Sequence, residues 1–314
     1  MSERVRITDV APRDGLQNEP AAIPTAEKVR LVELLIRAGV DEIESTSFVS
    51  PKWIPQLGDA ADVLAGVRGC LNGLPEGSTR PTISALVPNE KGMDRAVECR
   101  SSGLPHKIAL FTAASETFNK KNINATIEES VERFRPVVAS ALEHRIPIRV
   151  YVSCAIACPF EGPIEPSVVL SAIERVRTLF NGADWHGVDL DLADTIGVAH
   201  PYASRQLLSA IDASARARLT LHLHDTFSRA AACVKEALSM GVRAFDGSSG
   251  GLGGCPYAST EQKRAPGNIS TQHLVRAVEE AGYRTGVDTA KLREAGEYAE
   301  EIALRARRVR GARE

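Results

Sequence analysis

Short runs of branched and aliphatic residues alternate eight times with helix-like stretches along this chain of 314 residues. Such alternation is typical of repeated β-strand and α-helix units around a parallel sheet. The eight expected strands are Val5–Val10, Glu42–Phe48, Thr82–Val87, Lys107–Thr112, Ile148–Ser153, Val188–Leu192, Leu219–His224 and Arg243–Asp246. Eight units favour a closed (β/α)8 barrel, the TIM-barrel fold, whose catalytic residues lie at the carboxyl ends of the strands.

Helical patterns surround the expected strands and continue beyond the last one. The spacing of apolar residues predicts helices over Thr25–Ala38 and Thr126–His144, and Thr126 with Glu129 has the pattern of a capping box. The amphipathic stretch Lys291–Arg310 predicts a C-terminal helix, whose arginine-rich last turn we expect to be solvated. We therefore expect residues 1–314 to form one domain, with the barrel over about 1–286 and the added helix over about 288–310.

The composition favours a protein that acts on small metabolites. The net charge of -2 gives no electrostatic reason to expect a nucleic acid or an anionic membrane as a partner. No apolar run approaches the length of a membrane span, and a strand pattern begins so early that no targeting segment is expected. The six cysteines lack the spacing of a disulfide scaffold or a zinc ribbon, so we expect a reducing, cytoplasmic environment.

Two histidines end the seventh expected strand. Because side chains alternate between the two faces of a strand, His222 and His224 must point to the same side. At the carboxyl end of a barrel strand such a pair could hold a metal ion. The spacing alone is equally compatible with two ordinary histidines that form hydrogen bonds at a polar edge.

Charged residues also mark the first two strands. Arg13 and Asp14 follow the first strand, where they could act in catalysis or serve as a cap beside a salt bridge. In the second strand, alternation puts Glu42, Glu44 and Thr46 on one face. A carboxylate inside a barrel needs a partner, so we expect Glu44 to pair with Arg13 and to hold its guanidinium rigidly as an electrophile.

The sixth and eighth strands add two more candidates. Asp194 ends the sixth strand and is expected to face the substrate, whereas Asp189 and Asp191 lie deeper and are expected to be structural. The eighth strand leads into a glycine-rich loop that carries Cys255. We expect this loop to act as a lid and its thiol to have a chemical role. A phosphate-binding loop is a weaker alternative, because the sequence lacks the lysine of a GxxxxGKS/T motif there.

Motifs spread along almost the whole chain carry a resemblance to one enzyme family. They are Asp9–Pro20, Ser45–Gly58, Lys120–Asn124, Tyr151–Ala155, Asp194–Gly197, His222–Thr226, Gly250–Ala258 and Gly267–Asn268. In these segments the chain resembles the 3-hydroxy-3-methylglutaryl-CoA lyases, which belong to the metal-dependent lyase and aldol-condensing barrels. The Ser-Phe-Val-Ser-Pro-Lys-Trp block and the loop ending in Cys-Pro-Tyr-Ala favour the lyases over condensing relatives such as isopropylmalate and homocitrate synthases.

The resemblance implies a metal-dependent carbon–carbon cleavage of an acyl-CoA substrate. The implied ligands of a divalent cation, Mg²⁺ or Mn²⁺, are Asp14, His222, His224 and the side-chain carbonyl of Asn268. Donor chemistry alone leaves Zn²⁺ and Co²⁺ open. The implied products are acetyl-CoA and acetoacetate. Arg13 would stabilise the thioester enolate oxygen, Cys255 would protonate the enolate carbon, and Asp194 would position or help to deprotonate the substrate.

Three departures from the family pattern lie near these motifs. The segment between Cys255 and Asn268 is longer than usual, Phe227–Cys233 differs, and Gln272 stands where a glutamate is typical. These changes could alter the acyl group, so a lyase for another 3-hydroxy-3-alkylglutaryl-CoA is an alternative. An aldol-condensing acyl-CoA synthase and a catalytically silent acyl-CoA-binding protein are further alternatives, and a homodimer is expected.

Overall fold

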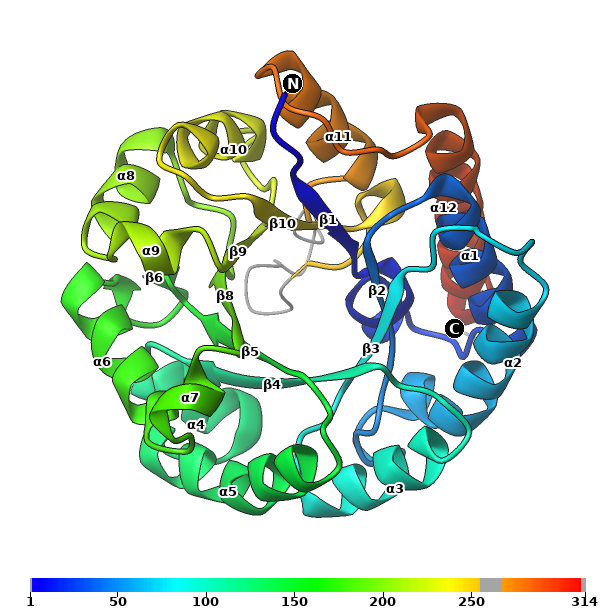
Figure 1. The fold of residues 1–314 in the computed structure, drawn as a ribbon, viewed down its shortest axis with the longest axis horizontal. Coiled ribbons are helices and arrows are strands. Elements are labelled where there is room, and N and C mark those ends of the chain that lie inside the picture. The colour runs from blue at the N-terminus through cyan, green and yellow to red at the C-terminus, as the bar shows by residue number, and fades with distance from the viewer. Residues whose placement is uncertain (1, 255–266, 312–314) are drawn as a thin grey trace.

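The eight expected strands form a closed parallel barrel in the computed structural model, which describes residues 2–254 and 267–311. They are β1 (Arg6–Asp9), β2 (Glu42–Ser47), β3 (Thr82–Leu86), β4 (Lys107–Ala113), β5 (Ile148–Ser153), β8 (Asp189–Asp194), β9 (Leu219–Leu223) and β10 (Ala244–Gly247). Their order around the barrel is β1-β10-β9-β8-β5-β4-β3-β2 (Figure 1). The prediction of a (β/α)8 barrel is confirmed, and the strand ends differ from the expected ones by at most two residues.

Helices cover the outside of the barrel (Figure 1). They are α1 (Thr25–Ala38), α2 (Ala60–Asn72), α3 (Glu90–Arg100), α4 (Glu116–Ile123), α5 (Ile127–Glu143), α6 (Pro166–Arg177), α7 (Gly182–Trp185), α8 (Pro201–Ser209), α9 (Ala213–Arg216), α10 (Ala230–Ser239), α11 (Thr271–Glu280) and α12 (Thr289–Gly311). Shorter turns are η1 (Ala11–Gly15), η2 (Pro55–Leu57) and η3 (Ser249–Gly251), and a small hairpin joins β6 (Ala157–Cys158) to β7 (Gly162–Pro163). Within the described ranges, no helix has both the length and the apolar character needed to cross a membrane.

Helix α5 begins as its sequence predicts. Thr126 Oγ1 accepts a hydrogen bond from the backbone N–H of Glu129 at 3.0 Å. In return, Glu129 Oε2 accepts from the backbone N–H of Thr126 at 2.8 Å. This reciprocal pair is the expected capping box, which satisfies two backbone donors that the first helical turn leaves free.

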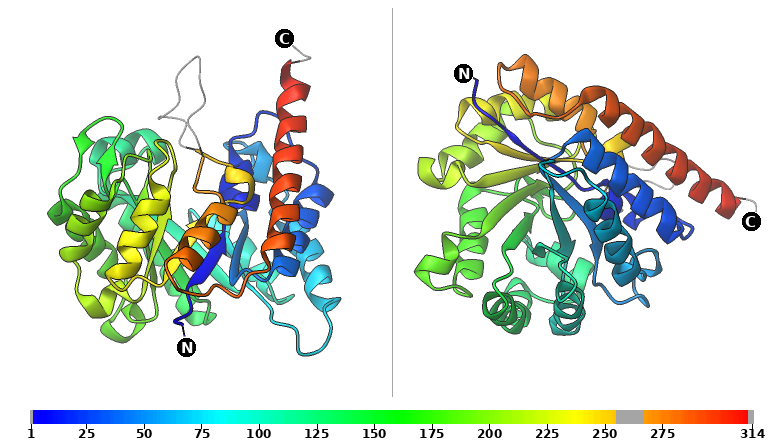
Figure 2. Two further views of the ribbon diagram at one scale, coloured as in Figure 1. Left: turned by 90° about the horizontal axis from the view of Figure 1, so that it is seen from above. Right: turned by 45° about the vertical axis from the view of Figure 1, so that its right-hand side comes forward.

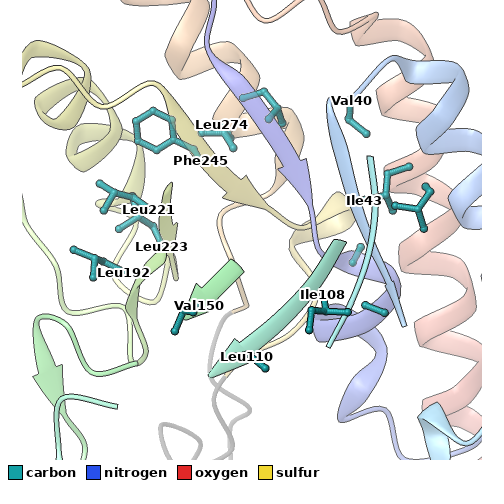
Figure 3. Close-up of a cluster of buried hydrophobic side chains, with 14 of the residues drawn as sticks. Val40, Ile43, Ile108, Leu110, Val150, Leu192, Leu221, Leu223, Phe245 and Leu274 are labelled. Carbon is teal, nitrogen blue, oxygen red and sulfur yellow. The ribbon is translucent and has the colours of Figure 1, made fainter. Parts of the chain in front are cut away.

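Apolar side chains on the outer faces of the strands form the main core. Figure 3 shows Leu192, Leu221 and Phe245 projecting from their strands away from the barrel centre. Phe245 lies beside Leu274 of α11 in the same cluster (Figure 3). Burial of such a side chain contributes roughly 1.5–3 kcal/mol relative to an exposed one. The layer between strands and helices therefore supplies much of the stability and leaves the inner face available for polar groups.

The inner faces of the strands carry buried charges in place of the branched apolar layers that usually fill such barrels. Lys107 Nζ donates to Glu42 Oε2 at 2.7 Å and also to Asp189 Oδ2. Arg149 is fully buried, and its Nη1 lies 3.5 Å from Asp191 Oδ2. Because a buried charge needs a partner, these ion pairs agree with the structural roles expected for Asp189 and Asp191.

A β-bulge in β2 changes which side chains face the interior. The pairing of β2 with β3 shifts its register between Glu44 and Thr46, which makes Ser45 the extra residue. An extra residue resets the alternation of side chains along a strand. The expectation that Thr46 shares the face of Glu44 is therefore wrong, and Ser47 lines the central cavity instead.

The C-terminal helix α12 packs along α1 on the outside of the barrel (Figure 2). Its buried face consists of Leu292, Ala295, Ala299, Ile302, Ala303 and Ala306. Arg305 and Arg307 in its last turn are exposed, as expected, with side chains 46% and 40% accessible, and both also form ion pairs. Arg305 Nη2 donates to Glu27 Oε2 at 2.8 Å, and Arg307 donates to both carboxylate oxygens of Glu19 at 2.7 and 2.9 Å. These pairs fasten the helix end to segments far away in the sequence.

Candidate active site

A cavity of about 650 Å³ opens at the carboxyl ends of the strands. Barrels hold their active sites at this end. The polar lining includes Arg13, Asp14, Tyr151, His222 and His224. The apolar lining includes Val49, Ile54, Leu86, Phe111, Phe118 and Phe134. The cavity thus joins a charged cluster to an apolar surface, as a site for an amphipathic small molecule would.

Asp14, His222 and His224 form a candidate metal site. One ligand atom from each residue lies within 4.8 Å of the others, and the two imidazole centroids are 5.2 Å apart. The alternation of β9 brings both histidines to the inner face, and η1 brings Asp14 to them from the end of β1. The convergence expected of the two histidines is confirmed, and a carboxylate joins them.

Hydrogen bonds fix the orientation of both imidazoles. His224 Nδ1 lies 2.8 Å from the backbone oxygen of Asp194. Because a carbonyl oxygen only accepts hydrogen bonds, Nδ1 must carry the proton and donate it. His222 Nδ1 lies 3.3 Å from Asp246 Oδ2. Such bonds on Nδ1 leave Nε2 with its lone pair directed at a metal ion, as is usual for metal-binding histidines. Burial, together with the nearby charge of His222, lowers the pKa of His224 to about 4, so His224 is neutral at pH 7.

The side chain of Asn268 completes the cluster. Its backbone pairs with His224 across an isolated β-bridge, and its Nδ2 donates to Asp14 Oδ2 at 2.8 Å. Its Oδ1 is buried and accepts no hydrogen bond from the described residues. A buried amide oxygen without a donor costs about 1–3 kcal/mol, and hard cations prefer oxygen ligands of this kind. One carboxylate, two imidazoles and one unpartnered amide oxygen therefore fit a divalent cation.

One glycine permits the close packing around this cluster. Gly253 has a φ of 101°, a backbone conformation that residues other than glycine rarely adopt. A Cβ at this position would lie 2.6 Å from Asn268 Nδ2 and 3.1 Å from Asp14 Oδ2. The close backbone approach expected of the glycine-rich segment is therefore present where that segment passes the candidate ligands.

Two carboxylates hold Arg13 beside the metal site. Its Nε donates to Glu44 Oε1, which is the pair expected from the sequence, and its Nη1 donates to Asp14 Oδ1 at 2.8 Å. Burial alone lowers the pKa of Arg13, but the charges of Glu44 and Asp14 outweigh burial and raise it. Burial likewise raises the pKa of Asp14, but Arg13 and His222 outweigh it and lower the pKa to about 2. Both groups are charged at neutral pH.

The carboxylate of Asp194 does not line the cavity, contrary to expectation. Its two oxygens accept hydrogen bonds from the backbone N–H groups of Val198 and Ala199, at 3.2 and 2.9 Å. Leu192 belongs to the outer core, so alternation also turns Asp194 outward and turns Ala193 toward the cavity. The residue contacts the metal cluster through its backbone oxygen, which binds His224.

Three residues of the site network escaped the sequence reasoning. Arg149 Nη1 donates to Asp246 Oδ1 at 2.9 Å, and Tyr151 Oη lies 3.1 Å from Glu44 Oε2. A signal was available in β5, where Arg149 and Tyr151 alternate with Ile148, Val150 and Val152 and must therefore face inward. Asp246 is the residue before the last in β10, near the end of the strand where catalytic residues usually lie.

The remaining candidates lie elsewhere. Cys255 falls outside the described residues. Phe227 and Arg229 do not line the cavity, since Arg229 lies over the Phe227 ring at 5.1 Å and donates to the backbone oxygen of Val198. Gln272 donates to the backbone oxygen of Leu292 at 3.0 Å and so joins α11 to α12. The described departures from the family pattern are therefore not part of the cavity lining.

Comparisons with known proteins agree with the family resemblance of the sequence motifs. A family model described as HMGL-like matches residues 4–298. The mitochondrial hydroxymethylglutaryl-CoA lyase of Homo sapiens is 42% identical over 299 residues, which cover 95% of this chain and 85% of that protein. A Pseudomonas aeruginosa protein named 3-hydroxy-3-isohexenylglutaryl-CoA/hydroxymethylglutaryl-CoA lyase is 41% identical over 300 residues, which cover 95% and 92%. The chain spans 58% of the length of an Arabidopsis thaliana relative.

Solved structures give the same grouping. An HMG-CoA lyase from Brucella melitensis has a TM-score of 0.85 at 41% identity, with 96% of this chain and 100% of that chain covered. An HMG-CoA lyase from Acinetobacter baumannii, solved with coenzyme A and 3-methylmalate, has a TM-score of 0.81 at 33% identity, with 96% and 92% covered. From its motifs, its barrel and these matches, we conclude that the chain belongs to the HMGL-like family of carbon–carbon lyases.

Proposed function

We propose that this chain is a divalent-metal-dependent lyase that cleaves 3-hydroxy-3-methylglutaryl-CoA to acetyl-CoA and acetoacetate. The observation that carries the proposal is that Asp14, His222 and His224 share one cavity with the paired guanidinium of Arg13. Cleavage of this substrate needs a group that makes the tertiary hydroxyl more acidic and a group that stabilises the thioester enolate. The lyase names of full-length relatives support the same reaction.

The donor set suggests which cation the site would hold. Asp14 and Asn268 offer oxygen atoms, and His222 and His224 offer nitrogen atoms. Oxygen donors, together with the hydroxyl and carboxylate of the substrate, favour Mg²⁺ or Mn²⁺, whereas the imidazoles also suit Zn²⁺ or Co²⁺. When bound, such a cation supplies positive charge that lowers the pKa of an alcohol.

Arg13 would act on the opposite end of the breaking bond. Because Glu44 and Asp14 fix its guanidinium, the N–H groups can donate from a set position to the oxygen on which negative charge develops. A preorganised donor of this kind typically raises kcat by about 100- to 1,000-fold. Its charge does not change during the reaction, because the neighbouring carboxylates raise the pKa of Arg13.

A general acid must then protonate the enolate carbon. We assign this step to Cys255, because the preceding residue, Gly254, lines the cavity. We assign Asp194 a positioning role in place of direct proton transfer. Its backbone oxygen, 2.8 Å from His224 Nδ1, fixes the tautomer that a metal ligand requires.

A lyase acting on a 3-hydroxyglutaryl-CoA with a longer C3 substituent is the second candidate. The observation that favours it is the apolar lining of the cavity by Leu86, Phe111, Phe118 and Phe134. Such side chains would bury an added isoprenoid or alkyl group at roughly 25 cal/mol per Å². The name of the Pseudomonas aeruginosa relative includes both a methyl and an isohexenyl substrate.

Product analysis tests both candidates. Purified protein is incubated with Mg²⁺ or Mn²⁺ and a panel of 3-hydroxyglutaryl-CoA thioesters. The members of the panel carry a methyl, an isobutyl or an isohexenyl group at C3. Release of acetoacetate and acetyl-CoA in equal amounts from the thioester with a methyl group at C3 supports the first candidate. Preferred cleavage of a longer ester supports the second. No cleavage of any ester by folded, metal-loaded protein would contradict both, and net condensation of the products would identify a synthase.

The remaining expectations concern partners and location. An acyl-CoA thioester is the proposed small-molecule partner, in agreement with the coenzyme A complex of the Acinetobacter baumannii structure. We also propose a homodimer, which sedimentation velocity would detect. Free thiols at Cys70, Cys99, Cys158 and Cys233 are compatible with the proposed reducing, cytoplasmic location.

A further inference from the structure

A chain of buried hydrogen bonds starts at the metal site and crosses the barrel interior. His222 Nδ1 lies 3.3 Å from Asp246 Oδ2. Tyr151 Oη lies 3.3 Å from the same carboxylate oxygen and 3.1 Å from Glu44 Oε2. The four side chains come from four different strands, and none is more than 5% exposed. Tyr151 thus lies between two carboxylates that belong to different parts of the site.

The same chain returns to the metal site on its other side. Glu44 accepts from Arg13 Nε, and Arg13 Nη1 donates to Asp14 Oδ1 at 2.8 Å. Asp14 and His222 are both candidate ligands, and their ligand atoms lie within 4.8 Å of each other. The hydrogen bonds therefore form a loop that begins and ends at the proposed cation, with Tyr151 opposite the cation.

The hydroxyl of Tyr151 has a single proton and two carboxylates within reach. A phenol has one proton, so it can donate to Glu44 or to Asp246 at one time. Arg149 Nη1 lies 3.3 Å from Tyr151 Oη and donates to Asp246 Oδ1 at 2.9 Å, which directs the phenol oxygen to accept from the guanidinium and to donate to a carboxylate. Hydrogen bonds between a phenol and a carboxylate are among the stronger kinds in a protein interior.

We propose that Tyr151 is a positioning residue that joins the metal site to the Arg13 guanidinium. Its hydroxyl holds Asp246, and through it the ring of His222, in the orientation for metal binding. The same hydroxyl can instead donate to Glu44, the carboxylate that holds Arg13, so its one proton is shared between the two halves of the loop. The inference rests on the proposed function, because it takes His222 as a metal ligand and Arg13 as the electrophile.

A direct role in substrate binding is the competing explanation, since Tyr151 also lines the cavity. The two roles differ in what they do to the protein without substrate. A positioning residue changes the affinity for the cation itself, because the orientation of His222 changes. A residue that only contacts substrate changes KM and leaves the cation affinity unaltered.

The test replaces Tyr151 with Phe, which removes the hydroxyl and retains the ring between Arg13 and Arg149. Mn²⁺ is titrated into metal-free protein by isothermal calorimetry without substrate. We expect binding about tenfold weaker than in the wild type, the low end of the range of about 10- to 100-fold for losing a direct partner of a metal ligand, because Tyr151 acts on His222 through Asp246. Tyr283→Phe is the matched control, because the Tyr283 hydroxyl contacts only the backbone oxygen of Leu238 among the bonds described and lies away from the cavity.

A double mutant tests the path through Asp246. If Tyr151 acts on the cation through Asp246, the pair Y151F/D246N binds Mn²⁺ no more weakly than D246N alone. Unchanged Mn²⁺ affinity in Y151F would overturn the proposal, and so would fully additive losses in the double mutant. Should D246N not fold, the Y151F titration decides alone. Because the titration needs no turnover, its result is independent of whether hydroxymethylglutaryl-CoA is the substrate.

Discussion

Arg149 shows how single residues sustain a charged barrel interior. It is fully buried, donates to Asp246 at 2.9 Å and lies 3.5 Å from Asp191. Arg149→Met keeps most of the side-chain volume but leaves both carboxylates without their shared cation. We expect the free energy of unfolding, measured by urea denaturation, to fall by about 3–5 kcal/mol.

The control for this change is Arg135→Met. Arg135 is an exposed residue of α5 that pairs with Glu132 on the same helix. Its replacement should change the free energy of unfolding by less than about 0.5 kcal/mol. Equal effects of the two substitutions would contradict the account of the barrel interior.

Asp194 gives a pH dependence with a definite sign. Burial raises its pKa to about 6 from an ordinary 3.8, so the folded protein keeps a proton that the unfolded chain has lost. Its contribution to stability is complete below pH 3.8 and disappears as the pH rises through 6. Asp194→Asn does not titrate, so the wild type should lose up to about 3 kcal/mol relative to it between pH 4 and pH 7. Urea denaturation across this range measures the difference, and a constant difference would refute the assignment.

Strand alternation explains which site residues could be predicted from the sequence. It placed His222 and His224 correctly because β9 is regular. It misplaced Thr46 because a bulge at Ser45 has no clear signature in the sequence. The outward direction of Asp194 follows from the same rule, since Leu192, two residues before it in β8, faces the outer core. Partners that meet across the barrel, such as Tyr151 with Glu44, depend on the register between strands and could not be predicted from either strand alone.

At the scale of elements, α12 is held by its apolar face against α1. Leu292 is 1% exposed, whereas Leu304 on the same helix is 47% exposed. Leu292→Ala should lower the free energy of unfolding by about 2–5 kcal/mol, because it leaves a cavity between the helices. Leu304→Ala is the matched control and should cost less than about 1 kcal/mol. Similar losses for the two variants in thermal or urea unfolding would show that α12 is not docked as described.

Periodicity predicted the eight barrel strands and the helices α1, α5 and α12, with ends that lie within two residues of the observed ones. The range of α1 was predicted correctly, and the capping box fixed the start of α5. The hairpin of β6 and β7 has two residues in each strand, which is too short to give an alternating pattern. The ion pairs of Arg305 and Arg307 with α1 and its preceding loop require tertiary contact, which the local sequence cannot reveal.

At the scale of the whole molecule, the barrel separates two tasks. Apolar residues on the outer faces stabilise the fold, and the inner faces carry the charged network below the cavity. The sequence predicted the (β/α)8 barrel because eight repeats of one local pattern leave few other arrangements. The clustering of Asp14 and Asn268 with the histidines was implied only by resemblance to a family, because residues 254 positions apart reveal no contact through spacing.

The central claim is that one divalent cation at Asp14, His222 and His224 is required for cleavage. Metal-free protein is titrated with Mn²⁺ while acetoacetate release from hydroxymethylglutaryl-CoA is recorded, in the wild type and in His224→Ala. We predict that cleavage is absent in chelator, rises to a plateau at one equivalent of Mn²⁺, and stays below one hundredth of the wild-type rate in H224A at that concentration. Full cleavage in chelator, or an unaltered titration in H224A, would contradict the claim.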